Sequence, residues 1–160
     1  MKRQAVLPGT FDPPTLGHLN VIQRASRLYD TLFVVIAVNA MKQCLFQEEE
    51  RLSMMKDLLK EYPNVKVFTW EGLVADFCRE HGIQVMIRGV RALADFGYEF
   101  ELAMTNKQLN PEIETVFMPT DPQFFVLRSS AIKEMAAYGA DISKMVPKRV
   151  ADALVQKLGN

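Results

Sequence analysis

A stretch rich in glycine and proline, residues 9–18, separates an apolar run from a segment with helical periodicity. It reads Gly-Thr-Phe-Asp-Pro-Pro-Thr-Leu-Gly-His, and residues 5–7 before it are apolar, which is typical of a buried strand. Residues 19–29 after it predict a helix, so the stretch is a tight strand-to-helix turn. A parallel α/β protein binds anions at such a turn, because the first turn of a helix carries unpaired N–H groups and partial positive charge.

Four residues of this stretch have the chemistry that an anion site needs. Gly9 lets the chain turn sharply and lets a ligand approach the backbone, and Thr10 adds a hydroxyl. Thr15 is a suitable N-cap, which places His18 in the first helical turn, facing the bound group. The stretch lacks the Gly-Lys-Ser/Thr ending of a P-loop and the three spaced glycines of a dinucleotide site. Taken alone, it fits a plain strand-to-helix turn equally well.

Length and charge limit the classes of protein to which the chain can belong. Its 160 residues predict a single domain, residues 1–160, and 49% of them are hydrophobic, as in ordinary globular proteins. The 19 basic and 19 acidic residues balance to a net charge of zero, which argues against a nucleic-acid partner. The longest apolar run, residues 32–38, is too short to span a membrane. Because Cys44 and Cys78 are far apart and no secretory signal is evident, we expect a cytoplasmic protein with reduced thiols.

Strand and helix patterns alternate along the whole chain. The expected strands cover residues 4–8, 31–39, 65–70, 84–88 and 114–118. The expected helices cover residues 16–29, 48–61, 73–80, 92–109, 129–138 and 147–158, and Gly97 interrupts the fourth of them. That helix contains Asp95-Phe96-Gly97, but the other motifs of a kinase are lacking. The order predicts an α/β protein with a Rossmann-like, five-stranded parallel sheet and helices on both faces.

Several cationic residues fall where such a sheet binds ligands, which is beyond the carboxyl ends of its strands. Lys42 follows the second expected strand, Arg88 ends the fourth and Arg91 follows it, and Arg128 precedes the helix after the fifth. With two serines at that helix start, they predict a polyphosphate site, because arginine forks onto phosphate oxygens and lysine acts as a movable point charge. Any one of these cations alone is more typical of a solvated surface, but four at equivalent positions favour a site.

A set of motifs that spans nearly the whole chain resembles one family. The motifs are Pro8-Gly9-Thr10-Phe11-Asp12-Pro13, Thr15-x-Gly17-His18, Phe46 with Glu49-Glu50-Arg51, Ile87-Arg88-Gly89-x-Arg91-Ala92, Asp95-Phe96-x-Tyr98-Glu99, and Ser129-Ser130 with Lys133-Glu134. In this pattern the chain resembles the phosphopantetheine adenylyltransferases, which belong to the nucleotidyltransferase superfamily with its T/HxGH signature. Thr15 favours this family, because the related cytidylyltransferases and nicotinamide mononucleotide adenylyltransferases usually carry histidine at that position.

The resemblance implies reversible adenylyl transfer as a step of coenzyme A biosynthesis. The phosphate of 4'-phosphopantetheine attacks the α-phosphorus of ATP in line, without a covalent intermediate, and dephospho-coenzyme A and pyrophosphate form. Mg²⁺ accompanies ATP, held mostly by phosphates and water, and no cluster of protein metal ligands is expected. The family also forms homohexamers and is inhibited by coenzyme A. Two alternatives stay open: a cytidylyl or mononucleotide adenylyl transferase of the same superfamily, and a non-catalytic nucleotide-binding module.

The resemblance also assigns site residues by position, in three overlapping sets. The catalytic set is His18, Thr10, Lys42 and Arg91. The acceptor-binding set is Thr10, Lys42, Leu73, Val74 and Arg88. The ATP-binding set is Thr10, Phe11, His18, Gly89, Val90, Arg91 and Glu99, followed by the loop Phe124, Phe125, Val126, Leu127, Arg128, Ser129 and Ser130. Within these sets, the resemblance implies that His18 stabilises the α-phosphate as it becomes five-coordinate.

Arg128 departs from the pattern of the family. The family usually has three small hydroxyl residues before this helix, and here the first of them is an arginine. Its guanidinium either adds a fork for phosphate or points to solvent.

Overall fold

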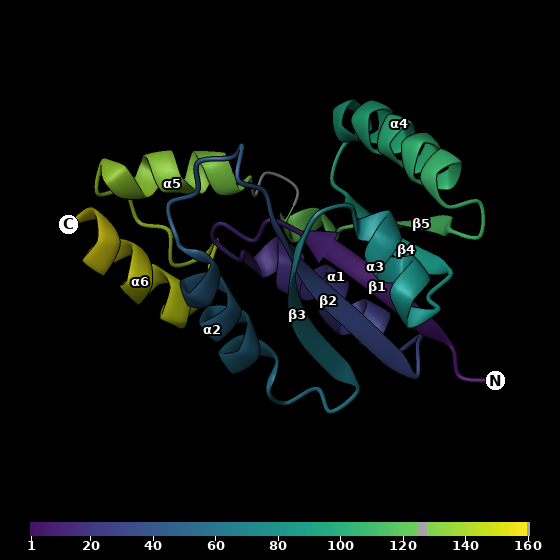
Figure 1. Ribbon diagram of the computed structural model, residues 1–160. Coiled ribbons are helices and arrows are strands. Elements are labelled where there is room, and N and C mark those ends of the chain that lie inside the picture. Colours follow the sequence, from purple (N-terminus) through teal and green to yellow (C-terminus); the bar gives the residue numbers. More distant parts are fainter. Residues whose placement is uncertain (125–127, 160) are drawn as a thin grey trace.

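The computed structural model describes residues 1–124 and 128–159, and a five-stranded parallel sheet forms its centre (Figure 1). The strands are β1 (Gln4–Gly9), β2 (Thr31–Val38), β3 (Val65–Glu71), β4 (Val85–Val90) and β5 (Glu114–Pro119). They are ordered β3-β2-β1-β4-β5, and every neighbouring pair is parallel. The predicted sheet is therefore confirmed.

Helices connect the strands and follow the last of them. They are α1 (Leu16–Ser26), α2 (Glu48–Leu59), α3 (Val74–His81), α4 (Leu93–Leu109), α5 (Ser129–Ala137) and α6 (Lys148–Leu158), with a short 3₁₀ helix η1 (Pro122–Phe124). Each α-helix coincides with a predicted one, whereas η1 has no counterpart in the prediction. Across the two described ranges, no helix is both long and apolar enough to cross a lipid bilayer.

Alternate residues of the strands point to opposite faces of the sheet, and helices cover both faces. On one face, Leu7 of β1 and Val34 of β2 pack with side chains of α1 and α2. On the other face, Val6 and Val35 pack with Phe77 of α3. Because both faces are covered, the strands are nearly continuous apolar runs rather than alternating ones.

A third apolar cluster joins the last two helices to α2. Ile132 of α5 and Val150 of α6 pack with Met54 of α2 and with Phe46, which lies in the loop before α2. In Figure 1, α5 and α6 accordingly lie on the side of the molecule that holds α2 and the C-terminus. This packing holds the start of α5 beside the turn that follows β1, where a hydroxyl of α5 donates to a carbonyl of the turn.

Three details differ from the sequence prediction. α1 ends at Ser26, three residues early, because the next backbone N–H groups bond to carbonyls three residues back and close a tighter turn. α4 runs through Gly97 without a break, since one exposed glycine costs a helix only about 1 kcal/mol. β4 continues to Val90, which pairs with Pro119 of β5, so Arg88 lies inside the strand rather than at its end.

The strand order creates a topological switch point between β1 and β4. From β1 the chain winds outward through β2 to β3, and it then crosses back to β4 and β5 on the other side. The connections that leave β1 and β4 therefore diverge at the carboxyl edge of the sheet. Ligands of open α/β sheets bind in the crevice that such a divergence leaves.

Candidate active site

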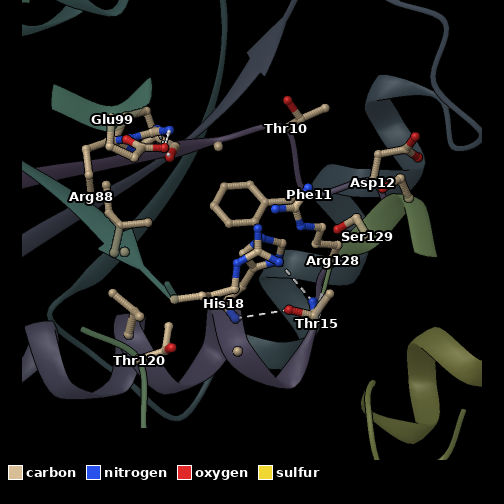
Figure 2. A pocket seen from close by; sticks show the side chains of 18 of the residues that line it. Thr10, Phe11, Asp12, Thr15, His18, Arg88, Glu99, Thr120, Arg128 and Ser129 are labelled. Atoms are coloured by element: carbon tan, nitrogen blue, oxygen red, sulfur yellow. Dashed lines mark hydrogen bonds and ion pairs between the residues drawn. The ribbon is translucent and has the colours of Figure 1, made fainter. Parts of the chain in front are cut away.

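A cavity of about 770 Å³ opens at this switch point. Its lining comes from the turn between β1 and α1, the loop after β2, β4, the first turns of α4, and the start of α5. Figure 2 shows the side chains of Thr10, His18, Arg88 and Arg128 around the same space. The volume is within the range of ordinary small-molecule sites, and the four cations predicted from the sequence all line it.

Thr15 and His18 form reciprocal hydrogen bonds at the start of α1. The backbone N–H of His18 donates to Thr15 Oγ1 over 3.1 Å, and the backbone N–H of Thr15 donates to His18 Nδ1 over 3.0 Å (Figure 2). The predicted N-cap is confirmed, and it is a capping box in which histidine replaces the usual Glu or Gln. Because Nδ1 accepts a hydrogen bond, the proton of the neutral imidazole is on Nε2, which is left as a donor.

The imidazole of His18 is neutral at physiological pH. Burial is the main cause that lowers the pKa of His18 to about 4, and the positive charges of Arg91 and Arg88 act in the same direction. The ring also packs edge-on against Phe11, with the two centroids 4.9 Å apart. The site therefore offers an uncharged N–H of fixed orientation at the start of α1.

Phe11 and Gly9 shape the turn that supports this ring. Phe11 has a φ of 52°, in the left-handed region, and its side chain is buried. A Cβ on Gly9 would lie 2.7 Å from Cζ of Phe11. A Cβ at position 9 would therefore force the phenyl ring to shift, because the ring folds back over Gly9 before it meets His18.

Asp12 is a buried carboxylate that ties three segments together. It accepts the backbone N–H groups of Leu45 and Phe46 over 2.9 Å each, and a hydrogen bond from Lys133 Nζ of α5, also over 2.9 Å. Burial raises its pKa, but the bonds from Lys133 and from the two backbone groups outweigh burial and hold the pKa of Asp12 below its ordinary value. The turn after β1, the loop before α2 and α5 are thus held in one arrangement.

A second buried charge, the guanidinium of Arg51 on α2, links the ends of two strands. Its Nη1 donates to the carbonyl of Thr10 over 2.9 Å and to the carbonyl of Ala37 over 3.3 Å. Arg51 thereby holds the backbone of Thr10 to the carboxyl end of β2. The loop that carries Lys42 leaves from that end.

Lys42 reaches back from this loop to the turn after β1. Its Nζ lies 3.5 Å from Thr10 Oγ1, and both residues line the cavity. The side chain of Lys42 is exposed, so its ammonium group can move toward a bound phosphate.

Arg88 and Glu99 form a bidentate ion pair in the wall of the cavity. Arg88 Nε donates to Glu99 Oε2 over 2.6 Å, and Nη2 donates to Oε1 over 2.8 Å. Arg88 Nη1 donates to the carbonyl of Pro8 over 3.1 Å. In Figure 2 the pair lies across the cavity from Asp12 and Ser129. Three anchors fix the plane of this guanidinium, and within residues 1–124 and 128–159 its remaining N–H groups have no acceptor, so they can bind an anion.

Arg91 and Arg128 share one carboxylate, that of Asp95 in the first turn of α4. Arg91 Nε donates to Asp95 Oδ2 over 3.2 Å, and Arg128 Nη2 donates to Asp95 Oδ1 over 3.1 Å. Of the two outcomes open for Arg128, the structure therefore places its side chain in the cavity and not toward solvent alone.

Most of the predicted site residues come together in this cavity. They are Thr10, Phe11, His18, Lys42, Arg88, Gly89, Arg91, Glu99, Arg128, Ser129 and Ser130. Their roles toward particular substrate groups stay predictions.

Four predicted residues do not line the cavity. Val90 is the last residue of β4, and Phe124 packs with the cluster of α5 and α6. Leu73 is exposed just before α3, and Val74 packs with the core beneath that helix. Both lie beyond β3, the edge strand two positions from β1. Phe125, Val126 and Leu127 lie outside the described residues.

Several other residues line the cavity although no role was predicted for them. Asp12, Tyr98, Thr120 and Lys133 are among them. Asp12 and Lys133 belong to the quoted motifs, yet 121 positions separate them, and no spacing rule connects residues that far apart. Asp12 itself was a usable signal in the sequence, because it is a charged residue inside the otherwise apolar turn Phe11-Asp12-Pro13-Pro14. A carboxylate that is buried there needs a partner of opposite charge.

The charged lining of the cavity suits phosphate better than a bare cation. Lys42, Arg88, Arg91, Arg128 and Lys133 all contribute to it. Within residues 1–124 and 128–159, no group of three or more His, Cys, Asp or Glu side chains is placed to hold a metal ion.

A Rossmann-like sheet with a histidine in the first turn of α1 and arginines around the switch point defines a nucleotidyltransferase. Residues 6–135 match the family model described as Cytidylyltransferase-like. The chain is also similar in fold to a Vibrio parahaemolyticus protein solved as a candidate nicotinate-nucleotide adenylyltransferase. The TM-score is 0.69, with 98% of this chain and 93% of that chain covered, and the identity of 18% limits this likeness to the fold.

Curated relatives are far more similar. The phosphopantetheine adenylyltransferase of Dictyoglomus thermophilum is 46% identical over 156 residues, which cover 98% of this chain and 95% of the relative. That of Streptomyces coelicolor is 44% identical over 158 residues, which cover 99% of each. The chain belongs to the phosphopantetheine adenylyltransferase family.

Proposed function

We propose that the chain transfers an adenylyl group reversibly from ATP to 4'-phosphopantetheine, giving dephospho-coenzyme A and pyrophosphate in coenzyme A biosynthesis. The observation that carries the proposal is the convergence of Thr10, His18, Lys42, Arg88 and Arg91 on one cavity. Relatives that match over nearly the whole chain and are named for this activity support the choice of acceptor.

In the proposed reaction one bond forms and one breaks. An oxygen of the acceptor phosphate attacks the α-phosphorus of ATP, and the bond from that phosphorus to the oxygen bridging it to the β-phosphorus breaks. The bridging oxygen keeps the electron pair and leaves as part of pyrophosphate. An anionic phosphate needs no base, so the protein has to hold two polyanions in line and stabilise the charge that develops between them.

His18 is the proposed donor to the α-phosphate. Its Nε2–H is available because Nδ1 is bonded to the backbone N–H of Thr15. Its low pKa supports a role as a neutral hydrogen-bond donor rather than as an acid or a base. A donor whose orientation is fixed in advance stabilises developing charge without reorganising.

Lys42, Thr10 and Arg88 are the proposed ligands of the attacking phosphate. The distance of 3.5 Å between Lys42 Nζ and Thr10 Oγ1 lets one phosphate oxygen contact both. Arg88 is anchored by Glu99 and by a backbone carbonyl, which supports an orienting role for Glu99 in addition to the proposed contact with ATP. We place the pantetheine arm toward Leu73 and Val74, along the carboxyl edge of the sheet.

ATP is proposed to bind along β4 and the start of α5. Gly89, Val90 and Arg91 would line this part of the site, and residues 124–130 would cover the adenine and the β- and γ-phosphates. Mg²⁺ is proposed to accompany the nucleotide, where it would neutralise phosphate charge. The cationic lining fits a metal whose ligands come from phosphate and water, as Mg²⁺ prefers.

We further propose that the chain forms a homohexamer and that coenzyme A inhibits it. An exposed apolar surface on α4 and β5 supports the assembly. It includes Leu93, Tyr98, Phe100, Met104, Leu109 and Val116. Coenzyme A contains the product as a part, so a site for dephospho-coenzyme A has the groups needed to bind it.

The single-domain organisation, residues 1–160, is likewise a proposal. It is supported by α6, whose Lys157 donates to Glu50 of α2 over 2.8 Å and ties the end of the described chain to its first half. A cytoplasmic location is supported by the two free cysteines, Cys44 and Cys78. Burial raises the pKa of Cys78 to about 11, so this thiol is unreactive.

One assay separates the proposal from its alternatives. Purified protein with Mg²⁺ and ATP should release pyrophosphate when 4'-phosphopantetheine is added, and dephospho-coenzyme A should appear in equal amount. CTP in place of ATP, and nicotinamide mononucleotide in place of the acceptor, should give no release. Activity with either substitute would favour another transferase of the superfamily. ATP binding without release for any acceptor would favour a non-catalytic module.

A further inference from the structure

The ion pairs of the cavity differ in strength, and the weakest belong to Asp95. Arg88 donates two hydrogen bonds of 2.6 and 2.8 Å to Glu99, and Lys133 pairs with Asp12, whose carboxylate is only 4% exposed. Arg91 and Arg128 each contact Asp95 through a single hydrogen bond, of 3.2 and 3.1 Å. The side chain of Arg128 is 61% exposed, so water reaches its guanidinium readily.

Asp95 lies between two cations from different parts of the chain. Arg91 follows β4, and Arg128 is the N-cap of α5. One carboxylate therefore joins the α4 side of the cavity to the α5 side, and it balances only one of the two positive charges. A pyrophosphate group carries more negative charge than a carboxylate and can fork onto both guanidinium groups, so it is a stronger partner for the same two side chains.

We infer that Asp95 competes with pyrophosphate for Arg91 and Arg128, and that it thereby weakens the hold of the site on the leaving group. Arg128 adds a second cation to this side of the cavity, and Asp95 offsets it. The competition favours release of pyrophosphate, a step of the kind that often limits turnover. The inference rests on the proposed function for the identity of the leaving group.

The test is equilibrium binding of inorganic pyrophosphate, measured by titration calorimetry in buffer containing Mg²⁺. Asp95→Asn should bind pyrophosphate about three- to tenfold more tightly than the wild type, because losing one ion-pair partner near the protein surface has an effect of this size. Arg128→Ser should bind it more weakly by a similar factor, and Arg128→Lys should recover part of the loss. When Asp95→Asn is added to Arg128→Ser, the gain in affinity for pyrophosphate should be smaller than in the wild-type background, because Arg128, one of the two partners of Asp95, is already gone.

Asp76→Asn is the matched control. Asp76 also lies in the first turn of a helix, α3, and also pairs with an arginine, but that partner, Arg79, does not line the cavity, whereas Arg91 and Arg128 do. Its removal should leave the affinity for pyrophosphate unchanged. An equal gain in this control would assign the effect to net charge and would overturn the inference.

Weaker or unchanged binding in Asp95→Asn would also overturn it, because Asp95 would then orient the arginines or have no influence on the phosphate. The gain in binding is decisive because a purely structural role for Asp95 predicts a loss. A wild-type protein that binds pyrophosphate but releases none from ATP and 4'-phosphopantetheine would contradict the proposed function, and the comparison of variants would still decide the role of Asp95.

Discussion

The backbone N–H of Thr15 donates to Nδ1 of His18 over 3.0 Å, and this bond decides where the proton of the imidazole lies. With Nδ1 occupied, Nε2 carries the proton and is the atom that can donate to a phosphate oxygen. The residue that caps the helix thus also sets the tautomer of the histidine. Local helix chemistry and the proposed catalysis depend on the same four-residue turn.

His18→Ala should lower kcat by about 10²–10³-fold, the usual effect of losing one donor to developing charge. The other histidine, His81, provides the control, because it is exposed and stacks on Phe77 outside the cavity, with ring centroids 4.0 Å apart. His81→Ala should keep the wild-type kcat. Steady-state rates of pyrophosphate release measure both, and an unchanged kcat in His18→Ala would refute the catalytic role.

The low pKa of His18 should make the free energy of unfolding depend on pH. The pKa is about 4 in the folded protein, against about 6.5 for an unfolded histidine, so between these values the unfolded chain binds more protons. The contribution of neutral His18 to the free energy of unfolding is therefore fully present above about pH 6.5. It is lost as the pH drops toward 4, and the loss is on the order of 3 kcal/mol. Urea unfolding of the wild type and of His18→Gln should show that the variant lacks this part of the slope. Parallel curves would mean that His18 titrates normally.

Asp12→Asn should destabilise the fold by about 2–4 kcal/mol, because an amide cannot accept from Lys133 and from two backbone N–H groups at once. Asp30 is the matched comparison. It also accepts a backbone N–H and a guanidinium hydrogen bond, both from Arg3, but it is exposed, so Asp30→Asn should leave the free energy of unfolding nearly unchanged. Denaturant titrations at pH 7 compare the two.

The two contributions are both lost as the pH falls, and the pH range of the loss distinguishes Asp12 from His18. Since the pKa of Asp12 is lowered in the folded protein, its contribution is present above the ordinary value near 4 and is lost as the pH falls further. Equal losses in Asp12→Asn and Asp30→Asn at neutral pH would show that the buried contacts contribute nothing special.

Gly9→Ala should lower stability by about 1–3 kcal/mol and reduce activity as well. The new methyl group would lie 2.7 Å from the ring of Phe11, which must shift, and His18 packs on that ring. Gly97→Ala serves as the opposite case, because nothing lies within 4 Å of a Cβ there and the residue is inside α4. That change should raise the melting temperature slightly, since alanine favours a helix by about 1 kcal/mol over glycine. A stable, fully active Gly9→Ala protein would show that the turn tolerates a shifted phenyl ring.

Met104→Glu should shift the assembly in solution toward the 18.2 kDa of one chain. Met104 is 57% exposed on the apolar surface of α4, and a charge there would be buried without a partner in an interface. Light scattering after gel filtration gives the mass. Lys56→Glu, at an exposed position of α2, changes charge outside that surface and should keep the wild-type mass. If the wild-type protein is itself monomeric, the proposed hexamer is wrong.

The sheet and its helices could be predicted from local patterns. Strands buried on both faces leave uninterrupted apolar runs, and Thr15, Gly82 and Gly159 mark helix ends through capping chemistry that acts over a few residues. The end of β4 was misplaced because a polar Arg88 looks like the end of an apolar run. Pairing with β5, which no local pattern reveals, continues the strand past it.

The sequence predicted many of the residues that line the site, but not which of them form ion pairs with one another. The rule that ligands bind beyond the carboxyl ends of parallel strands correctly predicted that Lys42, Arg91 and Arg128 lie around one cavity. It could not show that Asp95 bridges two of these arginines, or that Lys133 neutralises Asp12. Such pairs depend on how α4 and α5 pack, and their members are far apart in the sequence.

The buried guanidinium of Arg51 has a practical consequence for anyone who exchanges segments among related enzymes. Its Nη1 donates to the carbonyl of Thr10, just after β1, and to the carbonyl of Ala37, near the end of β2. A chimera that receives a foreign turn at positions 9–18 but keeps its own α2 would combine a turn and an Arg51 side chain that come from different proteins, so their contact would not be matched. The transplantable unit is therefore discontinuous in the sequence: the turn and α2 must be moved as a pair, although α1 and β2 lie between them.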